Sequence, residues 1–184
     1  GNEDDMVDRV CVFCGSRKGD DPLYHTAAAA LGRELAARQI GLVYGGGGIG
    51  LMGIIADAVL EARGEVIGVI PQDLALAEVM HAGVSDMRIV EDMHQRKGLM
   101  HQLCDAYIAL PGGVGTYEEL FEVVAWRQLK IHDKPVGLLD TRGYFEDFDS
   151  LIERCITEGF LKDQGRALTV REPDPRLLLE MMLS

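Results

Sequence analysis

The feature that most constrains the fold is a regular alternation between short apolar runs and segments with a helical pattern. Runs of strand length, rich in Val, Ile and Leu, occur at residues 9–14, 40–45, 65–70, 87–90, 105–110 and 134–139. Nearly continuous apolar runs are typical of parallel strands covered on both faces. Helix-patterned segments occur at residues 21–38, 50–63, 92–103, 116–130, 145–158 and 174–183. We therefore predict an α/β fold, with a doubly wound, mostly parallel Rossmann-like sheet and helices on both faces.

Nothing in the chain marks a boundary between domains. The 184 residues contain no internal repeat, low-complexity tract or Pro/Ser-rich linker. We predict a single Rossmann-like nucleotide-binding domain over residues 1–184, in which residues 1–7 form a flexible N-terminus. The acidic start, GNEDDM, lacks the features of a secretory signal, and no apolar run reaches the ~18 to 20 residues that span a bilayer.

Acidic residues clearly outnumber basic ones. The chain has 30 Asp and Glu against 18 Lys and Arg, a formal net charge of −12. Such a surface repels the phosphate backbone of nucleic acids and anionic lipid headgroups, so we predict neither nucleic acid nor membrane as a partner. A small anionic ligand is compatible with this charge, because backbone donors and helix ends act over short distances.

The cysteines do not form a disulfide scaffold, because four are too few in a chain of this length. Cys11 and Cys14 form a C-x-x-C pattern, which in other contexts binds zinc or carries out redox chemistry. Here the pattern lies in a strand-like stretch, so the two side chains point to opposite faces. His94 and His101 have no carboxylate at metal-ligand spacing. We predict buried structural cysteines in a reducing cytoplasm, and no metal site.

Ligands of doubly wound sheets bind where the strands end, so the loops that follow the strands are the candidate sites. Gly45, Gly47 and Gly50 form a G-x-G-x-x-G pattern between a strand and a helix. Glycines there let backbone N–H groups approach an anion. We expect Gly46, Gly47 and, across the sheet edge, Ser16 to contact a ligand. An NAD site is disfavoured, because the next strand ends without the acidic residue that holds the ribose.

A second glycine-rich loop, Pro-Gly-Gly-Val-Gly-Thr at residues 111–116, ends another strand and opens another helix. Two such loops at one sheet edge predict one ligand held from two sides, through a phosphate and the neighbouring sugar. The alternative is that both loops are only tight strand-to-helix turns. Thr116 and Glu119 have the spacing of a capping box. Because a cap needs only one glutamate, the additional Glu118 and Glu122 favour a functional cluster.

A basic cluster begins another predicted helix. Asp92 and Gln95 are placed to cap it, but Arg96 and Lys97 follow in its first turns, where the helix dipole disfavours cations. Gly98 inside the same helix costs about 1 kcal/mol relative to alanine. Two local rules broken together indicate a functional site. The alternative is a pair of solvated basic side chains.

These residues resemble a known family. The pattern P-G-G-x-G-T-x-x-E occurs at residues 111–119, and M-H-Q-R-K at residues 93–97. Together with the glycine-rich stretch at residues 45–53 and the tract at residues 126–139, they resemble the LONELY GUY (LOG) family of cytokinin-activating phosphoribohydrolases. The resemblance extends over roughly residues 9–160.

The resemblance implies hydrolysis of the N-glycosidic bond of AMP or an N6-modified AMP to the free base and ribose 5-phosphate, without a metal or organic cofactor. It implies that Arg96 and Glu119 are the catalytic pair, and that Glu78 and Lys97 help to hold the nucleotide. It adds a substrate-binding loop composed of Gly112, Gly113, Val114, Gly115, Thr116, Tyr117 and Glu118. It also implies a homo-oligomer, at least a dimer.

Two further interpretations follow from the residues. Apolar positions on the helix at residues 50–63 are candidates for the subunit interface, namely Leu51, Met52, Ile54 and Ile55. A non-catalytic nucleotide-binding or sensing module would use the same loops, but it would not need Arg96 and Glu119.

Members of the family have been labelled lysine decarboxylases, and that chemistry requires a lysine for a Schiff base. Lys97 alone lies near the predicted site.

Overall fold

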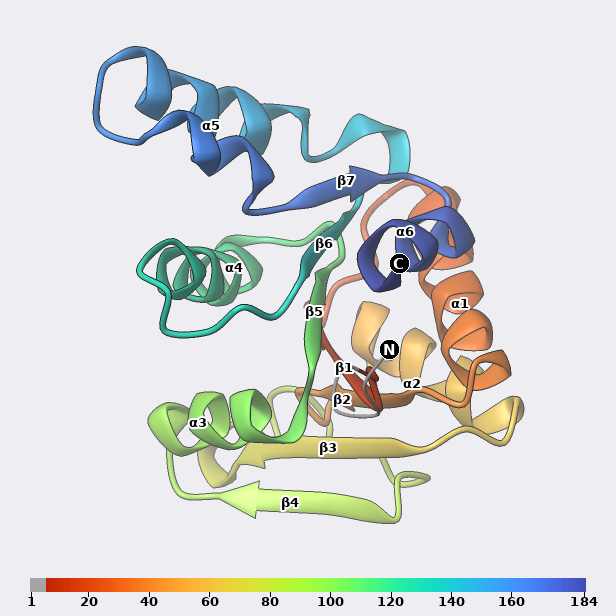
Figure 1. The fold of residues 1–184 in the computed structure, drawn as a ribbon. Helices are drawn as coiled ribbons and strands as arrows, with labels where there is room; N and C mark the ends of the chain where they lie inside the picture. The colour runs from red at the N-terminus through yellow and green to blue at the C-terminus, as the bar shows by residue number, and fades with distance from the viewer. Residues whose placement is uncertain (1–5) are drawn as a thin grey trace.

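Seven parallel strands form one continuous sheet in the computed structural model, which describes residues 6–184 (Figure 1). The strands are β1 (Arg9–Phe13), β2 (Gly41–Tyr44), β3 (Val66–Pro71), β4 (Asp86–Val90), β5 (Ala106–Ala109), β6 (Val136–Leu139) and β7 (Val170–Glu172). Their order across the sheet is β4-β3-β2-β1-β5-β6-β7. Parallel neighbours need crossover connections, and α-helices provide them here except between β3 and β4, where the connection contains only a short 3-10 turn.

Helices cover both faces of the sheet (Figure 1). The helices α1 (Pro22–Ala37), α2 (Gly50–Glu61) and α6 (Pro175–Leu183) lie on one face. The other face carries α3 (Met93–Leu103), α4 (Val114–Gln128) and α5 (Glu146–Thr157). Short 3-10 turns complete the fold, namely η2 (Gln72–Leu74), η3 (Thr141–Gly143) and η4 (Asp163–Ala167).

The pleat of the strands divides the core into two clusters. In β1, Val10 and Val12 pack against α1 and α2, whereas Cys11 and Phe13 face the helices of the opposite side. This division follows from the two-residue period of a strand. Cys14 continues the alternation and packs against the first cluster, which confirms that the two cysteines point to opposite faces.

Several helices begin at residues whose side chains supply the cap. Asp21, Asp92 and Asp174 each accept a hydrogen bond from a backbone N–H of the first turn that follows. The capping box predicted for Thr116 is wrong. Helix α4 begins at Val114, its N-cap residue is Gly113, and no side chain within residues 6–184 caps it. Thr116 instead lies inside the helix and packs over the preceding loop.

The predicted fold class is confirmed, and each of the six predicted strands and six predicted helices occurs within a few residues of its expected bounds. The seventh strand, β7, was not predicted, because its three residues include two charged ones and give no apolar run. The predicted interface residues Leu51, Met52 and Ile55 are instead buried. They belong to the core cluster between α1, α2 and the sheet, and Ile54 is partly buried against it.

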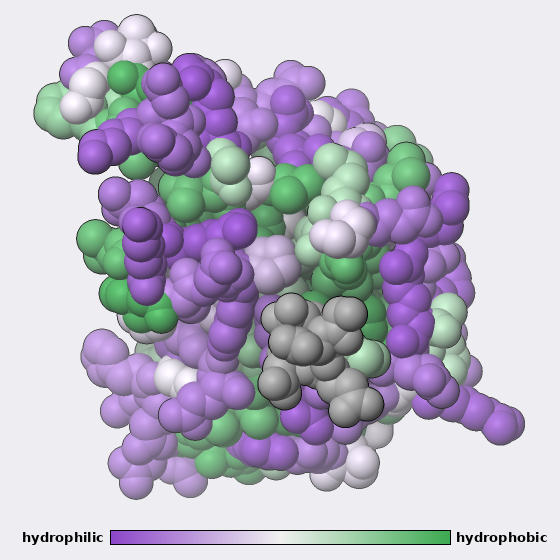
Figure 2. Space-filling model, in the orientation of Figure 1, coloured by the Kyte–Doolittle hydropathy of each residue, from purple (hydrophilic) through white to green (hydrophobic). Residues whose placement is uncertain are grey.

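Of the N-terminal segment predicted to be flexible, residues 1–5 lie outside the described residues, and Val7 packs against the core. Within residues 6–184, no helix combines the length and the apolar composition needed to cross a membrane. The face seen in Figure 2 is mainly hydrophilic, with smaller hydrophobic areas between the charged side chains.

The sheet contains one switch point, between β1 and β5. The chain proceeds outward from β1 through β2, β3 and β4 on one side, and through β5, β6 and β7 on the other. Loops that leave β1 and β5 therefore diverge and open a crevice at the carboxyl ends of these strands.

Candidate active site

A cavity of about 480 Å³ occupies the crevice at the switch point. The loop after β1 lines it with residues 14–19, and the loop after β5 lines it with Pro111, Gly112 and Gly113. Helix α3 contributes Arg96 and helix α4 contributes Glu119. The volume is within the usual range for a small-molecule site.

The loop at residues 111–116 presents open backbone groups to this cavity. A methyl group added at Gly113 or Gly115 would meet nothing within 4 Å. The N–H groups of Val114, Gly115 and Thr116 donate no hydrogen bond within residues 6–184. They are the free donors of the first helical turn, where the helix dipole also favours negative charge. The start of α4 is therefore suited to a phosphate group.

The loop at residues 45–50 is different, because its glycines permit close packing. Gly50 has φ +61°, and a methyl group there would lie 2.2 Å from the backbone carbon of Ser16. Gly48 donates its N–H to the Val79 carbonyl oxygen at 2.5 Å. Gly46 and Gly47, predicted to contact a ligand, are buried and do not line the cavity. The loop joins the segment after β1 to the segment that carries Glu78.

Arg96 is buried and fully engaged. Its Nη2 donates to the Gly45 carbonyl oxygen at 2.6 Å, and its Nε donates to the Val69 carbonyl oxygen at 3.1 Å. The guanidinium also pairs with Glu78, with 3.0 Å between Nη2 and Oε2. A side chain at position 45 would meet the guanidinium, since an added methyl group would lie 2.0 Å from Nη2. The absence of a side chain at Gly45 therefore leaves space for the arginine at the wall of the cavity.

Glu119 lies in the cavity without a hydrogen-bond partner among the described residues. Burial raises the pKa of its carboxyl from 4.5 to about 7, and the nearby Arg96 opposes this rise. The negative charges of Glu118 and Glu78 raise the pKa further. Arg96, which the resemblance makes the catalytic partner of Glu119, forms its ion pair with Glu78 and no direct bond to Glu119. Glu119 is left free to act on a ligand.

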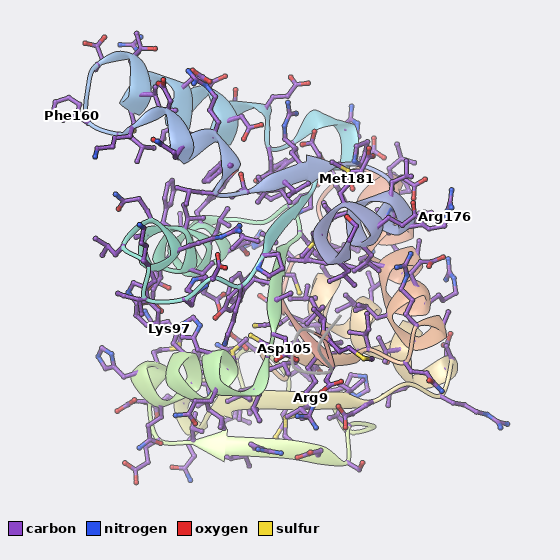
Figure 3. All side chains as sticks on the ribbon, in the orientation of Figure 1. Arg9, Lys97, Asp105, Phe160, Arg176 and Met181 are labelled. Atoms are coloured by element: carbon purple, nitrogen blue, oxygen red, sulfur yellow. The ribbon has the colours of Figure 1, made fainter. Side chains whose placement is uncertain are left out.

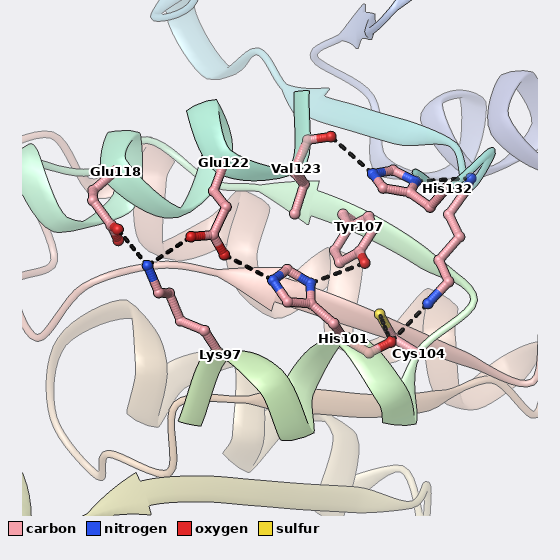
Figure 4. Close-up of polar contacts among 9 residues, drawn as sticks. Lys97, His101, Cys104, Tyr107, Glu118, Glu122, Val123 and His132 are labelled. Atoms are coloured by element: carbon pink, nitrogen blue, oxygen red, sulfur yellow. Dashed lines mark hydrogen bonds and ion pairs between the residues drawn. The ribbon is translucent and has the colours of Figure 1, made fainter. Parts of the chain in front are cut away.

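Lys97 is held between α3 and α4, outside the residues that line the cavity (Figures 3 and 4). Its Nζ contacts Glu118 Oε1 at 2.6 Å and Glu122 Oε2 at 2.7 Å. These two bonds raise the pKa of Lys97. Glu122 also bonds to His101 at 2.9 Å, and His101 bonds to the Tyr107 hydroxyl at 3.0 Å (Figure 4). Lys97 therefore ties the two helices together rather than reaching toward the ligand position predicted for it.

The other predicted residues divide between the cavity and its surroundings. Ser16, Gly112, Thr116 and Glu118 line the cavity together with Glu78. Val114 and Tyr117 do not.

Val114 is 88% exposed to solvent. Tyr117 stacks on Tyr144, with 6.4 Å between the ring centroids.

Several lining residues were not singled out from the sequence. They are Arg17, Lys18, Tyr24, Leu74, Met93 and Tyr144. Arg17 and Lys18 had a usable signal, because they form a basic pair in a loop that follows a strand of an acidic chain. Tyr144 had none, since it lies far along the chain after β6 and reaches the cavity only through the fold.

Within the described part of the chain, no group of three or more His, Cys, Asp or Glu side chains is arranged to hold a metal ion. The chemistry that the cavity itself offers is an open helix N-terminus for an anion, and a free carboxyl group one and a half turns further along the same helix.

Comparison with known proteins gives a consistent set of relatives. The sequence model of the family described as "Possible lysine decarboxylase" matches residues 52–182. "Probable cytokinin riboside 5′-monophosphate phosphoribohydrolase LOGL2" from Oryza sativa subsp. japonica is 51% identical, over 95% of this chain and 71% of that protein. "Cytokinin riboside 5′-monophosphate phosphoribohydrolase LOG1" from Arabidopsis thaliana is 49% identical, over 95% of this chain and 82% of that protein.

Solved structures share the fold at lower identity. The molybdenum cofactor binding protein from Rippkaea orientalis superposes with a TM-score of 0.71 at 20% identity, over 94% of this chain and 93% of that chain. The molybdenum cofactor carrier protein from Chlamydomonas reinhardtii gives 0.70 at 20% identity, over 95% of this chain and 97% of that chain. At these identities the likeness describes the architecture alone.

Proposed function

This chain belongs to the LONELY GUY (LOG) family of phosphoribohydrolases, and from that premise we propose that it hydrolyses the N-glycosidic bond of a cytokinin riboside 5′-monophosphate. The products are the free base and ribose 5-phosphate. The observation that carries the proposal is Glu119, a carboxyl group in the cavity that has no hydrogen-bond partner among residues 6–184 and whose pKa is raised by burial to about 7.

The 5′-phosphate of the substrate docks at the start of α4. The free N–H groups of Gly115 and Thr116 donate to its oxygens, and the helix dipole adds to the attraction. Arg17 and Lys18 line the same cavity from the loop after β1 and contribute positive charge. This arrangement explains how a chain with a net charge of −12 binds an anionic substrate.

Glu119 acts on the ribose. Cleavage of the C1′–N bond passes through a state with oxocarbenium character at C1′, and water supplies the new oxygen. The Glu119 carboxylate activates this water or stabilises the positive charge, and its pKa near 7 suits proton transfer at neutral pH. The departing base leaves with a proton, and the hydroxyl group of water remains on C1′ of ribose 5-phosphate.

Arg96 supports this carboxylate without a direct bond to it. Its positive charge lowers the pKa of Glu119 against the effect of burial, which keeps a fraction of the carboxyl ionised at neutral pH. Bonds to Gly45, Val69 and Glu78 fix the guanidinium in place. Arg96 is therefore a rigid source of charge at the reacting centre.

The contacts of Lys97 argue against lysine decarboxylation. A lysine that forms a Schiff base needs a lowered pKa, so that a neutral amine is present. Lys97 is bonded to two carboxylates, and its pKa is raised instead.

The proposal extends to three finer points. Unmodified AMP is a substrate as well, because the contacts named above are to phosphate and ribose. The chain acts as a homo-oligomer, at least a dimer, in the cytoplasm, where its free cysteines stay reduced. Size measurement in solution and fractionation of cells test the last two points.

Incubation with AMP and with N6-isopentenyl-AMP in the presence of a chelator tests the reaction. We expect release of base and ribose 5-phosphate, and loss of turnover by at least about 10³-fold in Glu119→Gln and in Arg96→Met. Glu158→Gln, a change at the exposed end of α5, is the control and retains wild-type turnover. If the wild-type protein binds AMP but releases no base, the chain is a non-catalytic nucleotide-binding module. Near wild-type turnover in Glu119→Gln contradicts the role assigned to this residue.

A further inference from the structure

The hydroxyl group of Tyr144 donates a hydrogen bond to the carbonyl oxygen of Gly112, the first glycine of the loop before α4. We infer that Tyr144 is a positioning residue of the proposed reaction, which holds the Gly112–Gly113 peptide so that its N–H faces the substrate's phosphate. The inference rests on the proposed function only for the identity of that phosphate.

The argument begins with the peptide itself. A trans peptide is planar, so the carbonyl group of Gly112 and the N–H group of Gly113 point in opposite directions. A bond that fixes the carbonyl oxygen therefore fixes the N–H as well. The Gly113 N–H donates no hydrogen bond within the described residues, and both glycines line the cavity.

The peptide needs such a restraint. It lies between two glycines, which restrict backbone rotation less than any other residues. Rotation of this peptide by half a turn would exchange the N–H for a carbonyl oxygen, which repels a phosphate. Gly113 is the N-cap residue of α4, and none of the described side chains caps that helix. Tyr144 thus supplies from a distant segment the restraint that the loop lacks locally.

Tyr144 is itself held on several sides. Its ring meets Tyr24 edge to face, with 6.1 Å between centroids, and stacks on Tyr117 at 6.4 Å. The next residue, Phe145, donates its backbone N–H to Asp140 Oδ1 at 2.8 Å. Arg171 of β7 bonds to the other oxygen of Asp140 at 2.7 Å. The C-terminal strand therefore anchors the segment that carries Tyr144.

Tyr144→Phe removes only the hydroxyl group and keeps the packing of the ring. Tyr107→Phe is the matched control, because it also removes a phenol hydroxyl that forms a hydrogen bond, here with His101 at 3.0 Å, and Tyr107 does not line the cavity. The probes are ribose 5-phosphate, which carries the phosphate, and adenosine, which does not. Calorimetry measures the dissociation constant of each probe for the wild-type protein and both variants.

We expect Tyr144→Phe to weaken ribose 5-phosphate binding about tenfold, because one hydrogen bond that restrains the loop is lost. Adenosine binding should weaken less than about twofold, because adenosine carries no phosphate. Tyr107→Phe keeps both constants within about twofold. The inference is overturned if Tyr144→Phe binds ribose 5-phosphate as the wild type does, or if it loses both probes equally. It is also overturned if the wild type binds no ribose 5-phosphate.

The proposed function fails independently of this result. Absence of base release by the wild-type protein contradicts the hydrolase, whereas the binding ratio reports on Tyr144 whether or not the bond is cut. The two failures are therefore distinguishable.

Discussion

The two glycine-rich loops have equivalent positions in the sequence, each between a strand and a helix. In the structure, however, the glycines of one loop are closely packed and those of the other are open. Each ends a parallel strand and opens a helix at the same edge of the sheet. In the loop at residues 45–50, methyl groups added to the glycines would meet neighbouring atoms at short distances. In the loop at residues 112–116, Gly113 and Gly115 face open space.

The difference shows that a glycine has two distinct uses at a strand end. The first loop needs small residues because the Arg96 guanidinium and the segment after β1 pack against it. The glycines of the second loop leave its backbone open, as the proposed docking of a phosphate requires. A substitution in the first loop should therefore affect folding, whereas one in the second should affect binding.

The largest effect is expected for Gly50→Ala. The added methyl group would lie 2.2 Å from backbone atoms, at φ +61°. Strain in the left-handed region and overpacking together cost about 3 kcal/mol of unfolding free energy, or roughly 6 to 12 °C in Tm. Gly159→Ala is the control, because Gly159 has φ +84° with open space around it and reports strain alone. If chemical denaturation shows that Gly50→Ala and Gly159→Ala lose the same unfolding free energy, the first loop is not closely packed.

The second largest effect concerns the carboxyl group of Glu119 on α4, the helix that follows the second loop. The folded pKa of Glu119 is about 7, above its ordinary value of 4.5, so the fold favours the protonated form. Ionisation therefore destabilises the native state progressively from pH 4.5 to 7, and fully above pH 7. A shift of this size corresponds to about 3 kcal/mol when fully buried, and about 1 to 2 kcal/mol for this partly open group.

Glu119→Gln removes this cost. We expect it to stabilise the protein by about 1 to 2 kcal/mol at pH 8 and very little at pH 4.5, measured by denaturation at both values. In the wild type, kcat/KM falls as the pH drops below about 7, because the carboxylate is the active form. A gain in stability that is independent of pH contradicts the raised pKa.

Gly115→Ala should weaken nucleotide binding and leave the unfolding free energy nearly unchanged, the reverse of the result expected for Gly50→Ala. Its methyl group enters the cavity and touches no protein atom, so unfolding free energy changes by less than about 0.5 kcal/mol. KM for the nucleotide rises about fivefold, since the methyl group stands where the phosphate docks. Steady-state kinetics and denaturation on the same preparation test this. Lost stability with an unchanged KM would remove the distinction between the loops.

The smallest effect is expected for Lys18, which lines the same cavity from the loop after β1. Its charge attracts the phosphate through solvent, so Lys18→Met raises KM about twofold at low salt and less at high salt. Lys162→Met, an exposed change immediately before η4, is the control and leaves KM unchanged. An effect that grows with salt concentration would contradict an electrostatic contribution.

Much of the fold was predictable because its signals are local. Apolar runs identified six strands, and Asp92 identified the start of α3. The strand β7 gave no such signal, because its pairing with β6 rather than its own composition makes it a strand. The start of α4 was misplaced by two residues, since a glycine cap leaves no side-chain signature.

The candidate site was predictable in its location and less so in its contacts. Glu78, Arg96 and Glu119 do meet at one cavity. The ion pair between Arg96 and Glu78 was not predicted, because the sequence spacing of charges does not reveal which carboxylate the fold brings to a guanidinium. Lys97 immediately follows Arg96, and yet it faces α4 rather than the cavity, since successive helical residues point in directions about 100° apart.

The sequence by itself determined the layered α/β architecture, the two glycine loops and the residue types that gather at the sheet edge. These depend on periodicity and turn chemistry over a few neighbouring residues. Only the tertiary structure decided which loop faces the cavity, which carboxylate pairs with Arg96, how far the pKa of Glu119 rises, and that Tyr144 restrains Gly112. Each of these depends on atoms that are distant in the chain, as the 51-residue separation of Arg96 and Gly45 illustrates. Packing sets such distances, and burial then sets the energies.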